Sequence, residues 1–444
     1  MTGRDSVDAA DSAAALRQPA GKPAVWRLMR AAALDLAPLR AHRDFRLLYV
    51  GQLISFFGNM LTSVALVFQV YALTRSPLAV GLLGAAQFVP LLLLAVVGGT
   101  LADALDRRRM VQATELALAL LSAALMVNAL LPHPRLWPLY LAGALAAGLD
   151  ALQRPSLTAL VPRLVEREEL VSAVALTKLR LSLGEIVGPA LAGVLIAFVG
   201  LPSAYGVDVA TFVVSLFTLR LMRAVPPARD ARRPSLGHVI EGLRYVRGQP
   251  VLLGTYLVDL VATFLAWPTA AFPALAVLYT RSRGAVPAAS ALGLLYAAPA
   301  VGALLASVTS GWTRRIHRHG RGVILAVLAW GLAITGLGLA PSLPLACACL
   351  MLVGGANLIS GVFRGALSSE TTPDALRGRL AGIEMICYTS GPLLGTVETG
   401  AVATLFTPGI AVLSGGILCV LGVSLLALAL PQLRRYDNQN RITR

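Results

Sequence analysis

The chain has 444 residues, of which 57% are hydrophobic and 14% are charged. A soluble protein of this length usually carries about 25% charged residues, so the composition excludes an ordinary soluble globular protein. The formal net charge of +16 is also found in nucleic-acid-binding proteins, but here the arginines lie in short clusters between long apolar runs. This distribution is typical of a multi-span membrane protein, and we expect no nucleic-acid partner.

The first 46 residues contain no long apolar run and no convincing signal peptide, so we expect a cytoplasmic N-terminal tail there. Twelve apolar runs follow, each close to or above the roughly 20 residues that cross a bilayer. The first six fill residues 47–221: Leu47–Leu73, Pro77–Ala102, Met110–Leu131, Leu136–Val161, Val171–Val199 and Ser203–Leu221. The second six fill residues 251–430: Val251–Tyr279, Pro287–Trp312, Gly322–Ala340, Leu343–Leu367, Leu380–Phe406 and Gly409–Leu430.

Between the two sets lies an arginine-rich linker, residues 222–250, and residues 431–444 form a second tail. Part of the linker, Ser235–Val246, has apolar residues at helical spacing, which fits either an amphipathic surface helix or a solvated segment. The fold class we predict is therefore an all-α integral membrane protein, with twelve transmembrane helices in two six-helix halves.

The arginines give this arrangement an orientation. With the N-terminus inside, the inner loops hold clusters such as Arg107–Arg109, Arg229–Arg233 and Arg314–Arg321. The opposite loops would hold only Arg75, Arg135, Arg281 and Arg283. The positive-inside rule then predicts an inner (plasma) membrane protein with both termini in the cytoplasm.

The two halves also echo each other. Arg154–Pro162, near the end of the fourth span, has a counterpart in Arg364–Pro373 near the end of the tenth. Gly188–Pro189 in the fifth span is matched by Gly391–Pro392 in the eleventh. Paired six-span halves with a site between them at the midplane are a transporter architecture, although this repeat is weak.

Motifs for other energy sources and chemistries are missing from the sequence. Neither lysine, Lys22 or Lys178, lies in the G-x-x-x-x-G-K-[ST] pattern, so transport must draw on an ion gradient, a substrate gradient or a separate subunit. We find no nucleophile elbow or His-rich metal motif, and predict neither an enzyme, a cofactor nor a metal site. His317 and His319 lie among arginines, which favours a solvated charge cluster. The cysteines, expected to be buried thiols, are Cys347, Cys349, Cys387 and Cys419.

One stretch, Gly98–Arg109 (GGTLADALDRRR), resembles the signature of the major facilitator superfamily between its second and third spans. The matching residues are Gly99, Leu101, Asp103, Arg107 and Arg108. Asp106 stands where the family usually has a second glycine, a variant of the exporter branch that resembles the enterobactin exporter and macrolide efflux proteins. The resemblance implies that Asp103 and Arg107 form a cytoplasmic latch between the halves; the alternative is an ordinary turn whose arginines only set topology.

A second motif of that branch lies in the fifth span. Gly184, Gly188, Pro189 and Gly193 place small residues along one helix, which allows close approach of another backbone. A similar segment is associated with antiporters in this family, which implies export; tight helix packing is the simpler explanation, and both can hold.

Charged residues inside spans are costly and usually functional. Asp150 and Arg154 are four residues apart and share one helix face, where they can pair. The resemblance implies that the first, fourth, seventh and tenth helices line a central cavity. The cavity candidates on these helices are Asn59, Asp150, Arg154, Asp259, Asn357 and Arg364.

A proton-coupled exporter needs a carboxylate that alternates between its protonated and ionised forms. We place Asp259 first, Asp150 second and Glu185 third, and a structural ion pair is as good an explanation of the first two. Asn59 stands where relatives of that branch often carry an aspartate, which questions the coupling mechanism. Three further carboxylates nearer span ends fit snorkelling or helix capping: Asp208, Glu384 and Glu398.

We therefore predict a secondary active transporter that exports a small amphipathic molecule (a drug, macrolide or siderophore) by proton-coupled alternating access. An uptake permease and a lipid translocator are the alternatives. The partners we expect are a small-molecule substrate, protons and the lipid bilayer, and we expect the protein to be a monomer.

Overall fold

The computed structural model describes residues 35–104, 106–223, 244–283, 286–372 and 377–437, and these ranges contain helices and no strand. The first six spans are helices α4 (Arg43–Thr74), α5 (Pro77–Ala104), α6 (Arg107–Leu130), α7 (Trp137–Leu164), α8 (Leu170–Phe198) and α9 (Leu201–Leu221). A short helix, α3 (Ala37–Ala41), precedes them, and a 3-10 turn, η1 (Arg167–Glu169), leads into α8.

The second half begins with α11 (Pro250–Leu265), η2 (Pro268–Ala271) and α12 (Phe272–Arg283), which together occupy the place of one span. The remaining spans are α13 (Ala288–Thr309), α14 (His319–Gly338), α15 (Leu343–Thr371), α16 (Arg377–Leu405) and α17 (Pro408–Ala429). A 3-10 turn, η3 (Ser310–Arg315), follows α13, and a short helix, α18 (Pro431–Arg435), closes the described chain.

Within the described ranges, ten segments are long and apolar enough to cross a membrane. The two remaining long helices are α7 and α16, with 28 and 29 residues. At 1.5 Å per residue each is about 42 Å long, enough to span, and each packs among the other spans of its half. The all-α membrane fold with twelve spanning segments is the fold predicted from the sequence.

The seventh span differs from the prediction, because the sequence indicated one continuous helix over Val251–Tyr279 and the structure breaks it after Leu265. Pro268 and Pro273 lie just beyond the break, and a proline cannot supply the N–H that a continuing helix needs. The carbonyl oxygens freed there are satisfied from elsewhere. Trp330 Nε1 donates to the Ala266 carbonyl at 3.2 Å, and Thr399 Oγ1 donates to the Trp267 carbonyl at 3.1 Å. Broken backbone is tolerated at membrane depth where protein groups pair it in this way.

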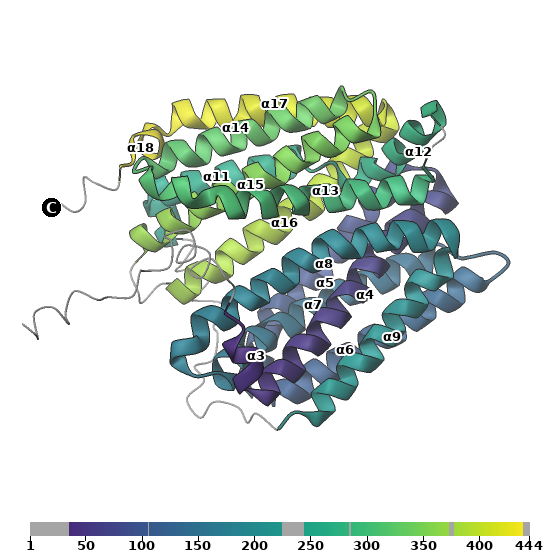
Figure 1. Ribbon diagram of the computed structural model, residues 1–444. Coiled ribbons are helices and arrows are strands. Elements are labelled where there is room, and N and C mark those ends of the chain that lie inside the picture. Colours follow the sequence, from purple (N-terminus) through teal and green to yellow (C-terminus); the bar gives the residue numbers. More distant parts are fainter. Residues whose placement is uncertain (1–34, 105, 224–243, 284–285, 373–376, 438–444) are drawn as a thin grey trace, which may run out of the picture.

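The two halves, α4–α9 and α11–α17, form separate helical bundles that diverge from one side of the molecule toward α3 and α18 (Figure 1). We call the side with residues 75–76, 199–200 and 406–407 the joined end, and the side with α3 and α18 the terminal end. The two most extensive contacts between the halves are made near the joined end, by α5 with α16 and by α8 with α13.

Glycines bring these two helix pairs close together. A Cβ on Gly400 of α16 would lie 2.7 Å from the Pro77 carbonyl oxygen, and a Cβ on Gly193 of α8 would lie 2.7 Å from the Ala289 carbonyl oxygen. A larger side chain would separate the backbones at either place. Two hydrogen bonds also cross here, from the Leu78 amide to Thr404 Oγ1 and from Ser290 Oγ to the Gly193 carbonyl.

Candidate functional site

A buried ion pair joins two spans of the second half. Arg364 Nη1 on α15 contacts Asp259 Oδ1 on α11, and the two residues are only 9% and 3% exposed. Asp259 lies nine residues into α11, about 14 Å from the helix start, which is close to the middle of a bilayer core about 30 Å thick. A charge at this depth is costly, and the pairing lowers that cost for both residues.

The first half contributes a second ion pair, on α7. Arg154 Nε donates to Asp150 Oδ2 at 2.8 Å on α7, as the four-residue spacing favours. Their side chains are 55% and 33% exposed, so this pair is far more open than the pair of Asp259 and Arg364. The carboxylate of Glu185 on α8 is also exposed and lies within electrostatic range of Arg154.

Tyr388 on α16 lies near both of these groups of charges. Its side chain is 53% exposed, yet it lies within electrostatic range of Glu185 and Arg154 in one half and of Asp259 and Arg364 in the other. A residue with charged neighbours in both halves lies between them rather than against lipid. We call these residues the central cluster: Asp150, Arg154, Glu185, Asp259, Arg364, Glu384 and Tyr388.

Glu384 adds a second carboxylate near Arg364. It is partly buried on α16, within electrostatic range of both Arg364 and Asp259. The sequence interpretation as snorkelling or capping did not foresee these electrostatic neighbours, which are the buried ion pair. Arg364 thus contacts one carboxylate and has a second, on a different helix, within electrostatic range, and a shift of α16 relative to α11 changes how much each of them neutralises its charge.

The two asparagines predicted in the cavity are less closely tied to this cluster. Asn357 lies about two turns before Arg364 on α15, and Asn59 lies on α4; both are partly buried. Among the described residues, neither side-chain amide hydrogen-bonds to a member of the central cluster.

The predicted gate motif is described only in part. Gly99 and Asp103 lie in the last turns of α5, and their side chains are outside the described part of the structure. Asp106 caps α6 by accepting from the amides of Arg108 and Arg109. Arg107 is buried and donates to the Ala159 carbonyl of α7 at 3.2 Å.

Arg108 extends the same network to α9. Its guanidinium donates to the carbonyl oxygens of Met222 and Arg220, where the helix C-terminus favours a positive charge. The described hydrogen bonds of Arg107 and Arg108 thus fasten α6 to α7 and α9, all within the first half.

The antiporter-like motif of α8 has two different neighbours. A Cβ on Gly184 would collide with the Phe56 ring, and a Cβ on Gly188 with Met60, both on α4. Farther along, Gly193 and the Pro189 carbonyl lie against α13 of the other half, where Gly293 provides the matching space. The motif therefore packs α8 against its own half first and the opposite half next.

The sequence interpretation missed a buried carboxylate in the first half. Glu115 on α6 is fully buried, and its Oε1 accepts from Gln52, from Ser215 at 2.9 Å and from Gln153 at 3.5 Å. Arg180 on α8 lies within electrostatic range. The sequence did contain a signal for this residue, because Glu115 lies inside an apolar run, and a charged residue within a membrane span is costly and usually functional.

Asp208 was misinterpreted as a residue near a span end. It is 1% exposed, and its Oδ2 accepts from Thr62 and Ser122 at 2.6 Å each, so it joins α9 to α4 and α6. Both Asp208 and Glu115 are surrounded mainly by neutral donors within one half. This arrangement indicates polar contacts that hold the bundle together.

Two smaller predictions also need correction. His319 is not in a solvated cluster, since it lies 3.3 Å from Glu370, packs on the Phe363 ring and has a side chain only 13% exposed. Of the cysteines, Cys419 is buried as predicted, whereas Cys347 and Cys349 are only partly buried. The side chain of Cys387 lies outside the described part of the structure.

Comparisons with known proteins identify the family to which this chain belongs. The family model described as "transmembrane secretion effector" matches residues 33–444. The enterobactin exporter of Escherichia coli O1:K1 is 32% identical over 408 residues, covering 91% of this chain and 95% of that protein. The enterobactin exporter of Citrobacter koseri is 33% identical over the same shares.

A solved structure supports the fold independently of close sequence similarity. The nucleoside transporter NupG aligns with a TM-score of 0.72 at 12% identity, covering 89% of this chain and 100% of that chain. At this identity the likeness concerns the fold alone. The protein is thus a multi-pass membrane transporter and not an enzyme, and the chain belongs to the transmembrane secretion effector family of the major facilitator exporters.

Proposed function

We propose that this protein is a proton-driven exporter of a small amphipathic molecule, and that it works by alternating access. The observation that carries the proposal is the central cluster, in which carboxylates and arginines from both halves lie within electrostatic range of Tyr388. A site of this kind is where transporters of two repeated halves bind substrate and coupling ion.

The orientation we propose follows the positive-inside rule, with both termini in the cytoplasm of a cell bounded by this inner membrane. The joined end is then the outer side, closed by the α5–α16 and α8–α13 pairs. In this state the halves, residues 47–221 and 251–430, diverge toward the cytoplasm (Figure 1), and we propose that substrate reaches the cluster from that side. Of the linker between them, residues 224–243 lie outside the described structure.

We propose that Gly99, Asp103, Asp106, Arg107 and Arg108 form the latch that closes the opposite, cytoplasmic side in the other state. In the present state, Arg107 and Arg108 brace α6 against α7 and α9. Rocking of the halves would bring this braced corner to the second half.

Asp259 is the carboxylate we propose for proton coupling, followed by Asp150 and Glu185. Its partner Arg364 has a second carboxylate within range, Glu384, so the ion pair can open without leaving the arginine uncompensated. Protonation of Asp259 would release Arg364 toward Glu384 or an anionic substrate. Asp150 is paired with Arg154 in a solvent-exposed ion pair, and Glu185 forms no ion pair with any described residue, which makes both weaker candidates.

The substrate class follows from the exposed groups of the cluster. Arg154 provides an accessible positive charge and Tyr388 an accessible aromatic ring, a combination that suits an amphipathic molecule with an acidic group. The relatives with the printed name enterobactin exporter make a siderophore the first substrate to test.

The test is transport into inside-out vesicles that contain the protein, with a panel of siderophores, macrolides and other antibiotics. An exporter accumulates its substrate in these vesicles when a proton gradient is imposed, and D259N abolishes the accumulation while D150N retains part of it. Accumulation only in right-side-out vesicles would indicate an uptake permease instead. Movement of labelled phospholipid without any pH gradient would indicate a lipid translocator.

A further inference from the structure

A cavity of about 240 Å³ lies between the two halves at the joined end, away from the central cluster. Helix α4 lines one side with Phe68, Tyr71 and Ala72, and α12 and α13 line the other. The walls from α12 and α13 are apolar, and they include Pro273, Val277, Ala288 and Leu292. The cavity therefore exists only while the halves are together at this end.

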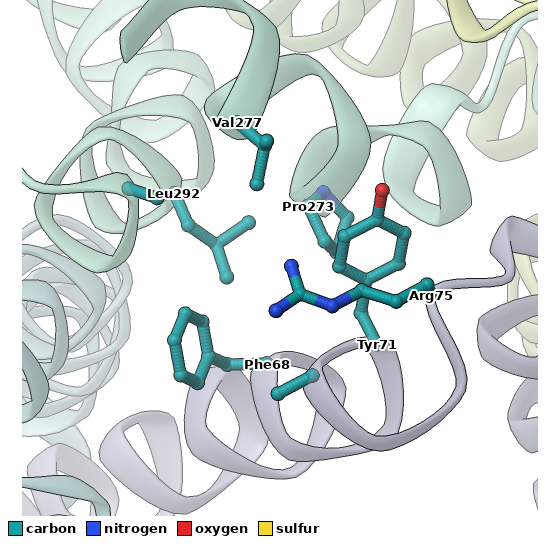
Figure 2. A pocket seen from close by; sticks show the side chains of 8 residues that line it. Phe68, Tyr71, Arg75, Pro273, Val277 and Leu292 are labelled. Atoms are coloured by element: carbon teal, nitrogen blue, oxygen red, sulfur yellow. The ribbon is translucent and has the colours of Figure 1, made fainter. Parts of the chain in front are cut away.

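One charged group enters this apolar space. The guanidinium of Arg75 points into the cavity between Phe68 and Leu292, with Tyr71 beside it (Figure 2). Among the described residues, no carboxylate forms an ion pair with Arg75. Arg75 is itself exposed, so an incoming ligand can reach its guanidinium, whose fixed fork of donors matches a carboxylate or phosphate.

The backbone of Arg75 is unusual. Arg75 ends α4 with φ of 54° and ψ of 22°, the only positive φ at a non-glycine residue in the described chain. This left-handed conformation is normally left to glycine or asparagine at a helix end, because a Cβ makes it costly. An arginine held here is an outlier of the kind that clusters at ligand sites.

We propose that this cavity binds an anionic amphiphile, whose carboxylate or phosphate pairs with Arg75 and whose hydrocarbon part fills the space between the halves. A volume of about 240 Å³ equals about eight water molecules at 30 Å³ each, so an acyl chain of about eight carbons fits. Two sources share this chemistry, the anionic lipid of the outer leaflet and an acidic solute on its way out.

Such a ligand would act on transport, and this consequence rests on the proposed alternating access. Because both halves line the cavity, the ligand binds the state with the joined end closed and not the state with that end open. At a concentration 100 times its Kd, it would shift the population toward the closed state about 100-fold. The site would thus act as a brake that a bound anionic amphiphile applies from the outer side.

Binding can be measured on the purified protein in detergent by isothermal titration calorimetry, with octyl phosphate and octanoate as probes. Octylammonium and octanol, which have the same chain without a negative charge, are the control ligands. We expect R75Q to weaken octyl phosphate binding at least tenfold, since charge-assisted hydrogen bonds contribute about that factor or more. R135Q is the matched control, because Arg135 is exposed in another loop of the joined end, and it should bind as the wild type does.

V277F provides a second variant, which fills the cavity from the opposite half and leaves Arg75 unchanged. Loss of binding in both R75Q and V277F supports the site, whereas equal binding by R75Q and wild type, or equally tight octanol binding, overturns it. Competition by phosphatidylglycerol in mixed micelles assigns the site to lipid, and competition by the exported substrate assigns it to cargo. If octyl phosphate binds in the calorimetry but leaves transport unchanged, only the proposed brake is refuted. The binding site stands in that case, since the calorimetry does not depend on transport.

Discussion

Removing one partner of the pair between Asp259 and Arg364 separates a proton site from a structural ion pair. Both residues are almost fully buried at mid-membrane depth. Breaking a buried pair by removing one partner costs about 3–5 kcal/mol, because the other charge is left uncompensated. For D259N we expect about 3 kcal/mol, the lower limit, since Glu384 remains near Arg364. A loss of that size reduces the ratio of folded to unfolded protein by roughly 100-fold.

The double variant D259N/R364Q removes both charges of the buried pair and leaves only the less buried Glu384 nearby, so it should recover most of the stability that either single variant loses. The coupling between the two sites should then be well above the 0.3–0.5 kcal/mol within which independent sites add. Unfolding in detergent, followed by tryptophan fluorescence during titration with sodium dodecyl sulfate, measures all four proteins. D150N is the control, because its i, i+4 pair is much more exposed and contributes only about 0.3–0.5 kcal/mol.

Transport by the same four proteins decides the role of Asp259. A proton site predicts that D259N/R364Q regains stability but not gradient-driven transport, since no group remains to carry the proton. A purely structural pair predicts that the double variant regains both. Recovery of proton-driven transport in D259N/R364Q would therefore refute the proposed role of Asp259, whatever its effect on stability.

Three further predictions concern the joined end and the buried network of the first half. In a background without the native cysteines, cross-linking L78C to T404C should stop transport, because this contact must open in each cycle, and a reductant should restore it. Transport by the cross-linked protein would contradict this prediction. G400V should separate α5 from α16 and so increase maleimide labelling of L78C from outside, since a Cβ on residue 400 would lie only 2.7 Å from the Pro77 carbonyl oxygen. Unchanged labelling would count against close packing of the two helices. E115Q should be less destabilising than E115A in thermal unfolding, because the amide keeps hydrogen bonds to the network; equal losses would show that the charge is what matters.

The sequence predicted the spans well because hydropathy and length report directly on a bilayer. The predicted run Gly409–Leu430, for example, differs from α17 by one residue at each end. The break in the seventh span could not be predicted with the same means. Its apolar residues continue past Leu265, and the groups that pair the freed carbonyls, on Trp330 and Thr399, lie far away in the sequence.

In the candidate site too, contacts within one helix could be predicted from the sequence, whereas contacts between helices could not. Asp150 and Arg154 form a pair that helical spacing alone favours. The sequence singled out Asp259 and Arg364 separately, but their contact depends on how α11 packs on α15. Asp208 was misplaced because its depth in the bundle depends on Thr62 and Ser122, its neighbours on two other helices.

The central claim, export driven by protons through the central cluster, is tested most directly by proton flux in proteoliposomes. The purified protein is reconstituted with a pH-sensitive dye inside, and substrate is added from the siderophore and antibiotic panel without any imposed gradient. We predict that a substrate drives proton movement in the opposite direction, in wild type and D150N but not in D259N. Substrate transport without any accompanying proton movement in the wild type would contradict the account.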